Sequence, residues 1–405
     1  MPPVEPPKTS LLPTALPIAL PIALPIALPI AITMGDPAGI GPEIIAKAFR
    51  DAPEVTAGCF VVGDVATLRR AVALIGGGLE VLELKSDEIS TQPAYSLHSL
   101  LQIKVLQIGE QNTAEQDADA DTAFETGKIS AKAGKAAADA VVWAARAALK
   151  GQIAALVTAP LHKEALALAG VKFPGHTELL QAEAAAFLGK SIKDVPVRMM
   201  LANEELRTVL VSIHLSLRDA IEAVTYENII ETIRITRDFL HRTVGNGLHS
   251  VGEKPRLRIG VAGLNPHAGE GGLFGREEID IISPAIAAAQ KEGVDNGVDD
   301  GIVVVGPFAP DTIFMRARDK IVIDDKGLAQ KQLGEFDAVV AMYHDQGLIP
   351  VKYLGVEQGV NVTLGLPLVR TSPDHGTAFD IAGQGIADAS SLIAAISMAK
   401  RLAKV

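Results

Sequence analysis

Three histidines of this chain each follow a short apolar run of strand type. His214 comes after RTVLVSI, His267 after RIGVAGLNP, and His344 after AVVAMY. Because parallel strands of an open α/β sheet end at the same edge, the three imidazoles could converge there. Neutral imidazoles with open positions suit zinc or a similar divalent ion. Any single histidine could instead be an ordinary structural residue, but three in equivalent positions favour a metal site.

A second group of side chains is suited to holding a phosphate or a carboxylate. Lys352 and Arg370 lie beside glycines and apolar residues, with Asn361 between them. His176 and Thr177 come just before a predicted helix, whose free N–H groups and dipole favour an anion. The alternatives are that Thr177 only caps the helix and that the two cations are surface charges. Taken together, the five residues predict a site for a small anionic substrate.

Composition limits the class of protein that can carry these residues. The chain has 405 residues, of which 48% are hydrophobic, so we expect two α/β domains. A net charge of −11 argues against nucleic acid as a partner, because no basic stripe is available to displace counterions. Cys59 is the only cysteine, which indicates a reducing, cytoplasmic location and excludes cysteine-based zinc modules.

Short apolar runs alternate with amphipathic stretches, which predicts parallel βα units. The segment from Pro29 to Asp51 is typical of a strand, a glycine-rich turn and a helix, in which Gly35, Gly39 and Gly41 permit the tight turn. Its GDPAGIG motif lacks the G-x-G-x-x-G spacing of the dinucleotide fingerprint. Further expected elements are a strand at 59–64, helices at 130–150 and 387–404, and a hairpin with its turn at 203–205.

The first 28 residues form an apolar tail, in which proline recurs at every fourth position from Pro17, a period that continues to Pro29. Proline at this period removes helical hydrogen bonds, so we expect a disordered tail and no transmembrane helix. A membrane-binding or partner-binding role is the alternative. The polar stretches 111–127, 245–254 and 293–301 are predicted to be surface loops.

The chain resembles the 4-hydroxythreonine-4-phosphate dehydrogenase family of vitamin B6 biosynthesis. The resemblance rests on the motifs GDPAGIGPE, GHTE, NPHAGEGG, MYHDQG and GVNVTLGLPLVRTSPDHGTA, in that order from residue 30 to the last helix. It implies two α/β/α domains with a cleft between them, as in isocitrate and isopropylmalate dehydrogenases. Residues 29–168 plus 355–405 would form the first, cofactor-side domain. Residues 169–354 would form the second, metal-side and dimer-side domain.

The resemblance also assigns roles to individual residues. His214, His267 and His344 match the family's ligands for one divalent ion (Zn, Mg or Co), the last contributed across the interface of a homodimer. His176, Thr177, Lys352, Asn361 and Arg370 match its substrate-binding positions. The turn DHGTAFDIAG, with His375, Gly376, Thr377 and Ala378, resembles the loop that binds the adenosine side of NAD or NADP.

The implied reaction is oxidation of 4-phosphooxy-L-threonine at its C3 hydroxyl, followed by decarboxylation to 3-amino-2-oxopropyl phosphate, in pyridoxal 5'-phosphate synthesis. Lys163, Asp311 and Asp345 are candidates for accepting the hydroxyl proton. One alternative is a paralogous dehydrogenase of 4-phospho-D-threonate or 4-phospho-D-erythronate. A three-histidine zinc hydrolase and an anion-binding module without catalysis are the alternatives from other classes.

Overall fold

The computed structural model describes residues 28–85, 89, 102–109, 124–243, 257–293, 301–323 and 329–403. Within these ranges the chain is a mixed α/β protein built on one sheet of twelve strands, which confirms the predicted fold class. The predicted disordered tail lies almost wholly outside the described residues, as do most of the predicted loops at 111–127, 245–254 and 293–301. Among the helices that the structure describes, none is both long and apolar enough to cross a membrane.

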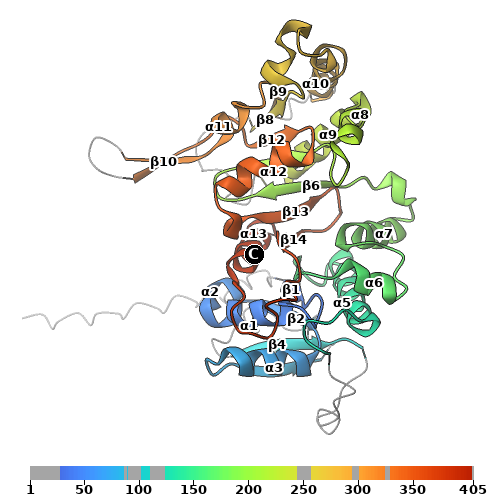
Figure 1. Cartoon of the computed structure of the whole chain (residues 1–405), viewed down its shortest axis with the longest axis vertical. Helices are drawn as coiled ribbons and strands as arrows, with labels where there is room; N and C mark the ends of the chain where they lie inside the picture. The colour runs from blue at the N-terminus through green and yellow to red at the C-terminus, as the bar shows by residue number, and fades with distance from the viewer. Residues whose placement is uncertain are drawn as a thin grey trace, which may run out of the picture.

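The sheet runs through the whole molecule from bottom to top in Figure 1. Across it the strands are β3 (Glu80–Leu84), β4 (Gln102–Gln107), β2 (Cys59–Gly63), β1 (Ile30–Thr33), β5 (Ala155–Thr158), β14 (Arg370–Pro373), β13 (Val360–Leu364), β6 (Arg198–Ala202), β7 (Arg207–Leu210), β12 (Ala338–Ala341), β8 (Leu257–Ala262) and β9 (Ile302–Phe308). A separate ribbon of β10 (Lys320–Ile323) and β11 (Ala329–Gln332) projects to the left in Figure 1.

Strand direction divides the sheet into two parallel blocks of opposite sense. The first block extends from β3 to β14, and the second from β7 to β9. Between them β13 is antiparallel to both β14 and β6, and β6 is antiparallel to β7. In a flat sheet the carboxyl ends of the two blocks would lie at opposite edges. A twist of roughly 20° per strand turns these ends toward one another across the intervening strands.

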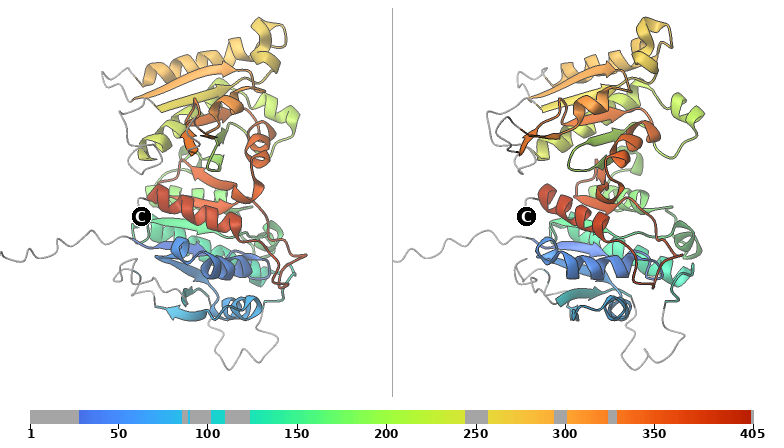
Figure 2. Two further views of the ribbon diagram at one scale, coloured as in Figure 1. Left: turned by 90° about the vertical axis from the view of Figure 1, so that its left-hand side faces the viewer. Right: turned by 60° about the vertical axis from the view of Figure 1, so that its left-hand side comes forward.

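Helices cover both faces of the first block (Figure 2). On β1, Ile30 and Ile32 belong to one buried cluster and Ala31 to another, because successive side chains of a strand point to opposite faces. The first face carries α1 (Gly41–Asp51), α2 (Pro53–Thr56), α3 (Val65–Ile75) and α13 (Ser390–Ala403). The second carries α5 (Ala131–Leu149), α6 (Lys163–Leu168) and α7 (His176–Leu188).

The second block is covered in the same way. On one face α9 (Tyr226–Thr243) and α10 (Ser283–Glu292) bury Ile233 and Ile286 against β8, β9 and β12. On the other face α11 (Ile313–Ala317) and α12 (His344–Tyr353) bury Phe314 and Leu348. The remaining short helices are α8 (Leu217–Glu222), η3 (Ile192–Asp194), η4 (Pro266–Gly272), η5 (Glu278–Ile282) and η6 (Val356–Gln358).

Several predicted elements are confirmed. The predicted helices at 130–150 and 387–404 correspond to α5, which Ser130 caps, and to α13. The predicted hairpin is β6–β7, whose turn is closed by the Asn203 side chain accepting hydrogen bonds from the N–H groups of Glu205 and Leu206. We keep the two-domain division as a proposal with one change. Leu180 and Ala184 of α7 pack with α5, so we place the boundary after α7 instead of at residue 169.

Candidate active site

A cavity of about 450 Å³ lies between the two blocks of the sheet. Its lining comes from the turn after β5 and the start of α7 on one side, and from the segment after β7 and α12 on the other. The predicted substrate residues all line it, together with two of the three predicted metal ligands: His176, Thr177, Lys352, Asn361, Arg370, His214 and His344. The opposite strand senses and the twist therefore bring distant parts of the sequence into one site.

Arg370, the first residue of β14, is the buried cation of this cavity. Its Nε and Nη2 donate to Thr158 Oγ1 at 3.2 and 2.8 Å, and Nη1 donates to Thr363 Oγ1 at 3.0 Å. Burial lowers the pKa of its guanidinium to about 10, although the Glu178 carboxylate opposes the shift. The group therefore keeps its positive charge at neutral pH. Because hydroxyl groups hold it, its charge is available to an anion.

The amino terminus of α7 points into the same cavity. The helix begins at His176 after Gly175, which caps it without a side chain, so Thr177 is not the cap that the sequence allowed as an alternative. His176 Nε2 is buried and has no hydrogen-bond partner among the described residues. Burial and the nearby charge of Arg370 lower the pKa of His176 well below its ordinary value of 6.5. A neutral imidazole and free backbone N–H groups thus face the space beside Arg370.

Lys352 and Asn361 complete the polar lining. Lys352, in the last turn of α12, forms an ion pair of 2.8 Å with Asp374. The lysine is therefore held in place, since its carboxylate partner is mostly buried, with 13% of that side chain exposed. Asn361 extends from β13 toward the cavity. Asn361 thus lies between the two blocks, Arg370 on the last strand of the first block, and Lys352 on the helix α12 that covers the second.

His214 and His344 form a pair on the second block. Their ring centroids are 5.7 Å apart, with the planes tilted by 41°. His344 is the first residue of α12, and its Nδ1 lies 2.7 Å from Asp345 Oδ1, which leaves Nε2 on the outer side of the ring. Burial, then the charges of Lys163 and His344, lower the pKa of His214. Neutral imidazoles are the form that binds metal ions.

His267 does not join this pair within one chain. Among the described residues no three His, Cys, Asp or Glu side chains are grouped closely enough to hold a metal ion. The reason is the backbone of η4, where residues 267 to 271 all have φ between 42° and 80°. This left-handed path carries His267 to the surface, where its ring lies 6.1 Å from that of Phe274. The resemblance implies that His344 is supplied by the other subunit, which stays a prediction; within the single chain His344 lies beside His214.

The predicted cofactor loop packs on the glycine-rich turn. Ile40 N–H donates to the carbonyl oxygen of Thr377 at 3.0 Å, and a Cβ on Gly39 would lie 2.9 Å from that oxygen. His162 stacks on Phe379 with centroids 5.0 Å apart. His375 and Gly376 line the cavity, whereas Thr377 is buried and Ala378 has φ of 39°. The four predicted residues are therefore contiguous with the site, and two of them face it.

The three candidates for proton transfer are placed differently. Lys163, at the start of α6, lines the cavity. Asp345 does not line the cavity, but its carboxylate contacts Nδ1 of His344, which does. Asp311 is exposed in the turn before α11 and does not line the cavity of its own chain. Sequence reasoning missed Thr158, Glu178 and Asp374, although the GHTE motif and the DHGTA turn contain the last two.

Comparison with known proteins gives consistent matches over most of the chain. A family model described as pyridoxal phosphate biosynthetic protein PdxA matches residues 56–399. The 4-hydroxythreonine-4-phosphate dehydrogenase of Beijerinckia indica subsp. indica is 47% identical over 371 residues, which cover 92% of this chain and 94% of that protein. The D-threonate 4-phosphate dehydrogenase of Salmonella typhimurium is 42% identical over 372 residues, with 92% and 98% covered.

A solved structure matches the fold as well. The crystal structure of 4-hydroxythreonine-4-phosphate dehydrogenase from Klebsiella pneumoniae superposes with a TM-score of 0.72 at 40% identity. The match covers 93% of this chain and all of that chain (100%). Both blocks of the sheet, and with them both sides of the cavity, lie within the matched part.

Proposed function

The chain belongs to the PdxA family of pyridoxal phosphate biosynthetic proteins, and on this premise we propose that it oxidises 4-phosphooxy-L-threonine at the C3 hydroxyl, with NAD or NADP accepting the hydride. The product, 2-amino-3-oxo-4-phosphooxybutanoate, is a 3-oxo acid and loses carbon dioxide to give 3-amino-2-oxopropyl phosphate. The coarser conclusion, a dehydrogenase of this family, follows from its relatives. The substrate, the cofactor and the residue roles are our proposal.

One observation carries the proposal: a single cavity gathers a buried arginine, a helix amino terminus and a pair of imidazoles. A phosphorylated amino acid brings two anionic groups and a hydroxyl, and the cavity offers a matching partner for each. The buried guanidinium of Arg370 and the start of α7 suit one anionic group, because both act in a partly desolvated space. Lys352, on the other side, suits the second.

The histidines fit a divalent ion only in part within one chain. His214 and His344 supply two nitrogen ligands, and the Asp345 carboxylate orients the second. Imidazole suits zinc and cobalt better than magnesium, which prefers oxygen ligands, so among the three predicted ions we favour the first two. When bound there, such an ion stabilises negative charge on the C3 oxygen.

We propose that the third ligand is His267 of a second copy of the chain. The residue is exposed and lies apart from the pair in its own chain, yet its glycine-rich loop follows β8, next to β12. A homodimer would bring this loop to the neighbouring pair. Exposed apolar side chains just after His214 and just after η4 are suited to such a contact: Leu215, Leu217, Leu273 and Phe274.

The remaining step is removal of the hydroxyl proton. Oxidation at C3 breaks the C–H bond, whose hydrogen leaves as hydride, and the O–H bond, whose proton needs an acceptor. Lys163 is the only one of the three predicted candidates that lines the cavity, so we assign it this role: its neutral amine would take the proton and become the ammonium. Asp345 is engaged with His344 and acts by orienting that ring.

The deciding experiment is nicotinamide reduction by the purified protein with 4-phosphooxy-L-threonine, with and without a chelator. Turnover that disappears on chelation and returns with zinc or cobalt supports the proposal. Absence of turnover with metal and either nicotinamide cofactor contradicts it. Product release without nicotinamide reduction would instead favour the hydrolase alternative.

A second candidate function is oxidation of 4-phospho-D-threonate or 4-phospho-D-erythronate. It is favoured by a relative at 42% identity that carries the name D-threonate 4-phosphate dehydrogenase. These substrates share the phosphate and the carboxylate, so Arg370, Lys352 and the histidines would serve them equally. Competition between the L-threonine compound and the D-threonate compound, measured as kcat/KM for each, separates the two functions.

A further inference from the structure

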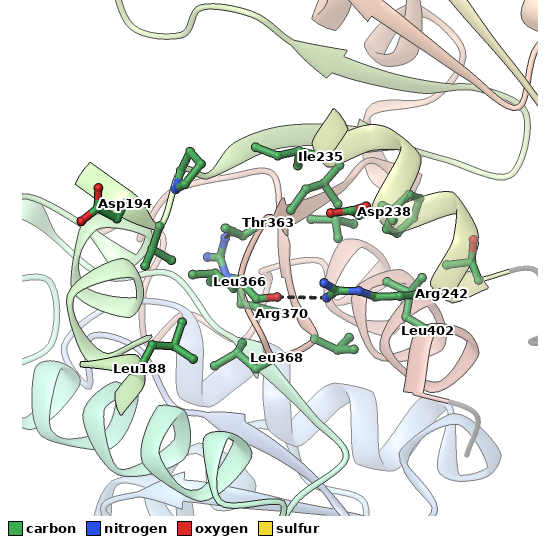
Figure 3. A pocket seen from close by; sticks show the side chains of 18 of the residues that line it. Leu188, Asp194, Ile235, Asp238, Arg242, Thr363, Leu366, Leu368, Arg370 and Leu402 are labelled. Atoms are coloured by element: carbon green, nitrogen blue, oxygen red, sulfur yellow. Dashed lines mark hydrogen bonds between the residues drawn. The ribbon is translucent and has the colours of Figure 1, made fainter. Parts of the chain in front are cut away.

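A second cavity, of about 270 Å³, lies beside the strands that join the two blocks (Figure 3). Val362 and Leu364 of β13 line it, whereas Asn361 lines the candidate active site. The two cavities lie next to one another along β13, because Thr363, between Val362 and Leu364, also lines the second one. Arg370 lines both cavities.

The interior of this cavity is apolar. Three buried leucines line it, with exposed fractions of 4%, 1% and 9%: Leu364, Leu366 and Leu402. Ile235 and Phe239 of α9 close one side. Cavities with such walls take branched or aromatic hydrocarbon groups, and their specificity comes from a few polar groups at the entrance.

The entrance carries charges of both signs. Asp238 and Arg242 are exposed and lie one helical turn apart on α9, on the face that borders the cavity (Figure 3). Such a pair usually forms an ion pair, but no ion pair joins the two among the described residues. Arg242 Nη1 donates to the Leu366 carbonyl oxygen at a long 3.3 Å, and the Asp238 carboxylate accepts no hydrogen bond from the described residues. Lys190 and Asp194 across the entrance bring the formal charge of the rim to zero.

We propose that this cavity is a binding site for a small zwitterionic amino acid with an apolar side chain. The ligand's ammonium would be accepted by Asp238 and its carboxylate by Arg242, with the side chain among the leucines. Both charges of the rim pair are then neutralised by a ligand of no net charge. A ligand with only a carboxylate would leave Asp238 facing another negative charge. A ligand with only an amine would leave Arg242 facing another positive charge.

The site is coupled to the active-site cavity through β13 and β14. Thr363, which lines the second cavity, holds the guanidinium of Arg370 at 3.0 Å. A ligand packed against Thr363 and Leu364 would therefore shift the guanidinium of Arg370, which we assign to binding the substrate's anionic group. We expect occupancy to change the substrate's KM.

The test measures binding to the substrate-free protein by calorimetry, so it does not depend on the proposed reaction. L-Leucine is the probe, and 4-methylpentanoate and 3-methylbutylamine are analogues that each lack one charge. We expect L-leucine to bind, and each analogue to bind about ten-fold or more weakly. Asp238→Asn and Arg242→Gln should each weaken L-leucine binding by a similar factor. Glu227→Gln and Arg234→Gln, on the same helix outside the cavity, are the matched controls.

Absence of binding at millimolar L-leucine overturns the proposal. Equal affinity for L-leucine and either analogue also overturns it, as does binding that the two cavity variants leave unchanged. The coupling is tested separately with whichever phosphorylated substrate turns over. A substrate KM that shifts with L-leucine in the native protein but not in Asp238→Asn supports it, and an unchanged KM in the native protein contradicts it.

Discussion

The imidazole of His214 lies 5.7 Å, centroid to centroid, from that of His344 in the same chain. The two residues follow neighbouring parallel strands, β7 and β12, so this pairing comes from the sheet order. In the proposed metal site these two residues are ligands of one ion, and the third ligand would come from another chain. Which residues are shared between subunits can therefore be tested genetically.

We expect His214→Ala, His267→Ala and His344→Ala each to lose the bound metal and most activity while keeping the thermal unfolding temperature, with His241→Ala on α9 as the control. Mixed dimers of His267→Ala and His344→Ala should regain up to about a quarter of native activity, because half the dimers then hold one intact site. Mixed dimers of His214→Ala and His344→Ala should regain none. Recovery in the second mixture would show that those two ligands come from different chains.

Arg370→Lys should raise the substrate's KM by about 10- to 100-fold, since a charge-assisted hydrogen bond contributes about 1.5–3 kcal/mol. The KM for NAD should change little. Thr158→Val removes the hydroxyl that accepts from Nε and Nη2, so it should raise the substrate's KM by a smaller factor without loss of charge. Initial-rate kinetics with each substrate varied check this. Equal effects on both KM values would contradict the assigned role.

Lys163→Met should lower kcat by about 10²- to 10⁴-fold with a modest change in the substrate's KM, because the group acts in the transition state. Lys193→Met, in the exposed η3, is the control. Native kcat in Lys163→Met would remove the lysine from the mechanism. Asp311→Asn then tests whether a second chain brings that carboxylate into the site.

Stability should fall with acid below about pH 6.5, because the unfolded state then binds a proton that His176 does not bind in the folded state. Burial, and next the charge of Arg370, keep the pKa of this imidazole well below 6.5 in the folded protein. The contribution of His176 to the unfolding free energy is therefore present above pH 6.5 and is lost as the pH falls below that value. Urea unfolding of the native protein and His176→Gln across about pH 5 to 8 measures the slope. A variant with the native slope would show that another group is responsible.

Gly39→Ala should raise the KM for NAD more than the KM for the substrate. Its new Cβ would lie 2.9 Å from the Thr377 carbonyl oxygen, so the loop that we assign to the cofactor must shift. The substitution does not alter a helix or a strand directly, because Gly39 lies in the turn before α1. Unaltered NAD affinity would place the cofactor elsewhere.

Local patterns predicted the elements well. The alternation of apolar runs, the cap Ser130 and the turn at Asn203 each act within a few residues, so their outcome follows from the sequence. The five residues predicted to bind the substrate do line one cavity. They could be singled out because cations and amides beside glycines at strand ends have few structural uses.

Long-range contacts explain what was missed. Thr158 ends an apolar strand, and its bond to Arg370 depends on the pairing of β14 with β5. Of the three glycines in GDPAGIG, only Gly35 has a positive φ, at 72°. Gly39 and Gly41 are required by close approach instead, since a Cβ on Gly41 would lie 2.2 Å from the Met34 carbonyl oxygen. Such approaches exist only after the chain has folded.

The antiparallel strands β13 and β6 join the two blocks, so a change in the width of the cleft would come from rotation about them. Asn361 lies on β13 between the blocks and Arg370 on the adjacent strand β14 at the edge of the first block, whereas Lys163 and the histidine pair lie on opposite blocks. If one block rotated about these strands, the gap between Lys163 and the histidine pair would change while Asn361 and Arg370 kept their places. If Arg370 anchors the substrate as we propose, the gap then selects substrates by length, and one shorter by a carbon would not bring its hydroxyl to Lys163 and the histidines.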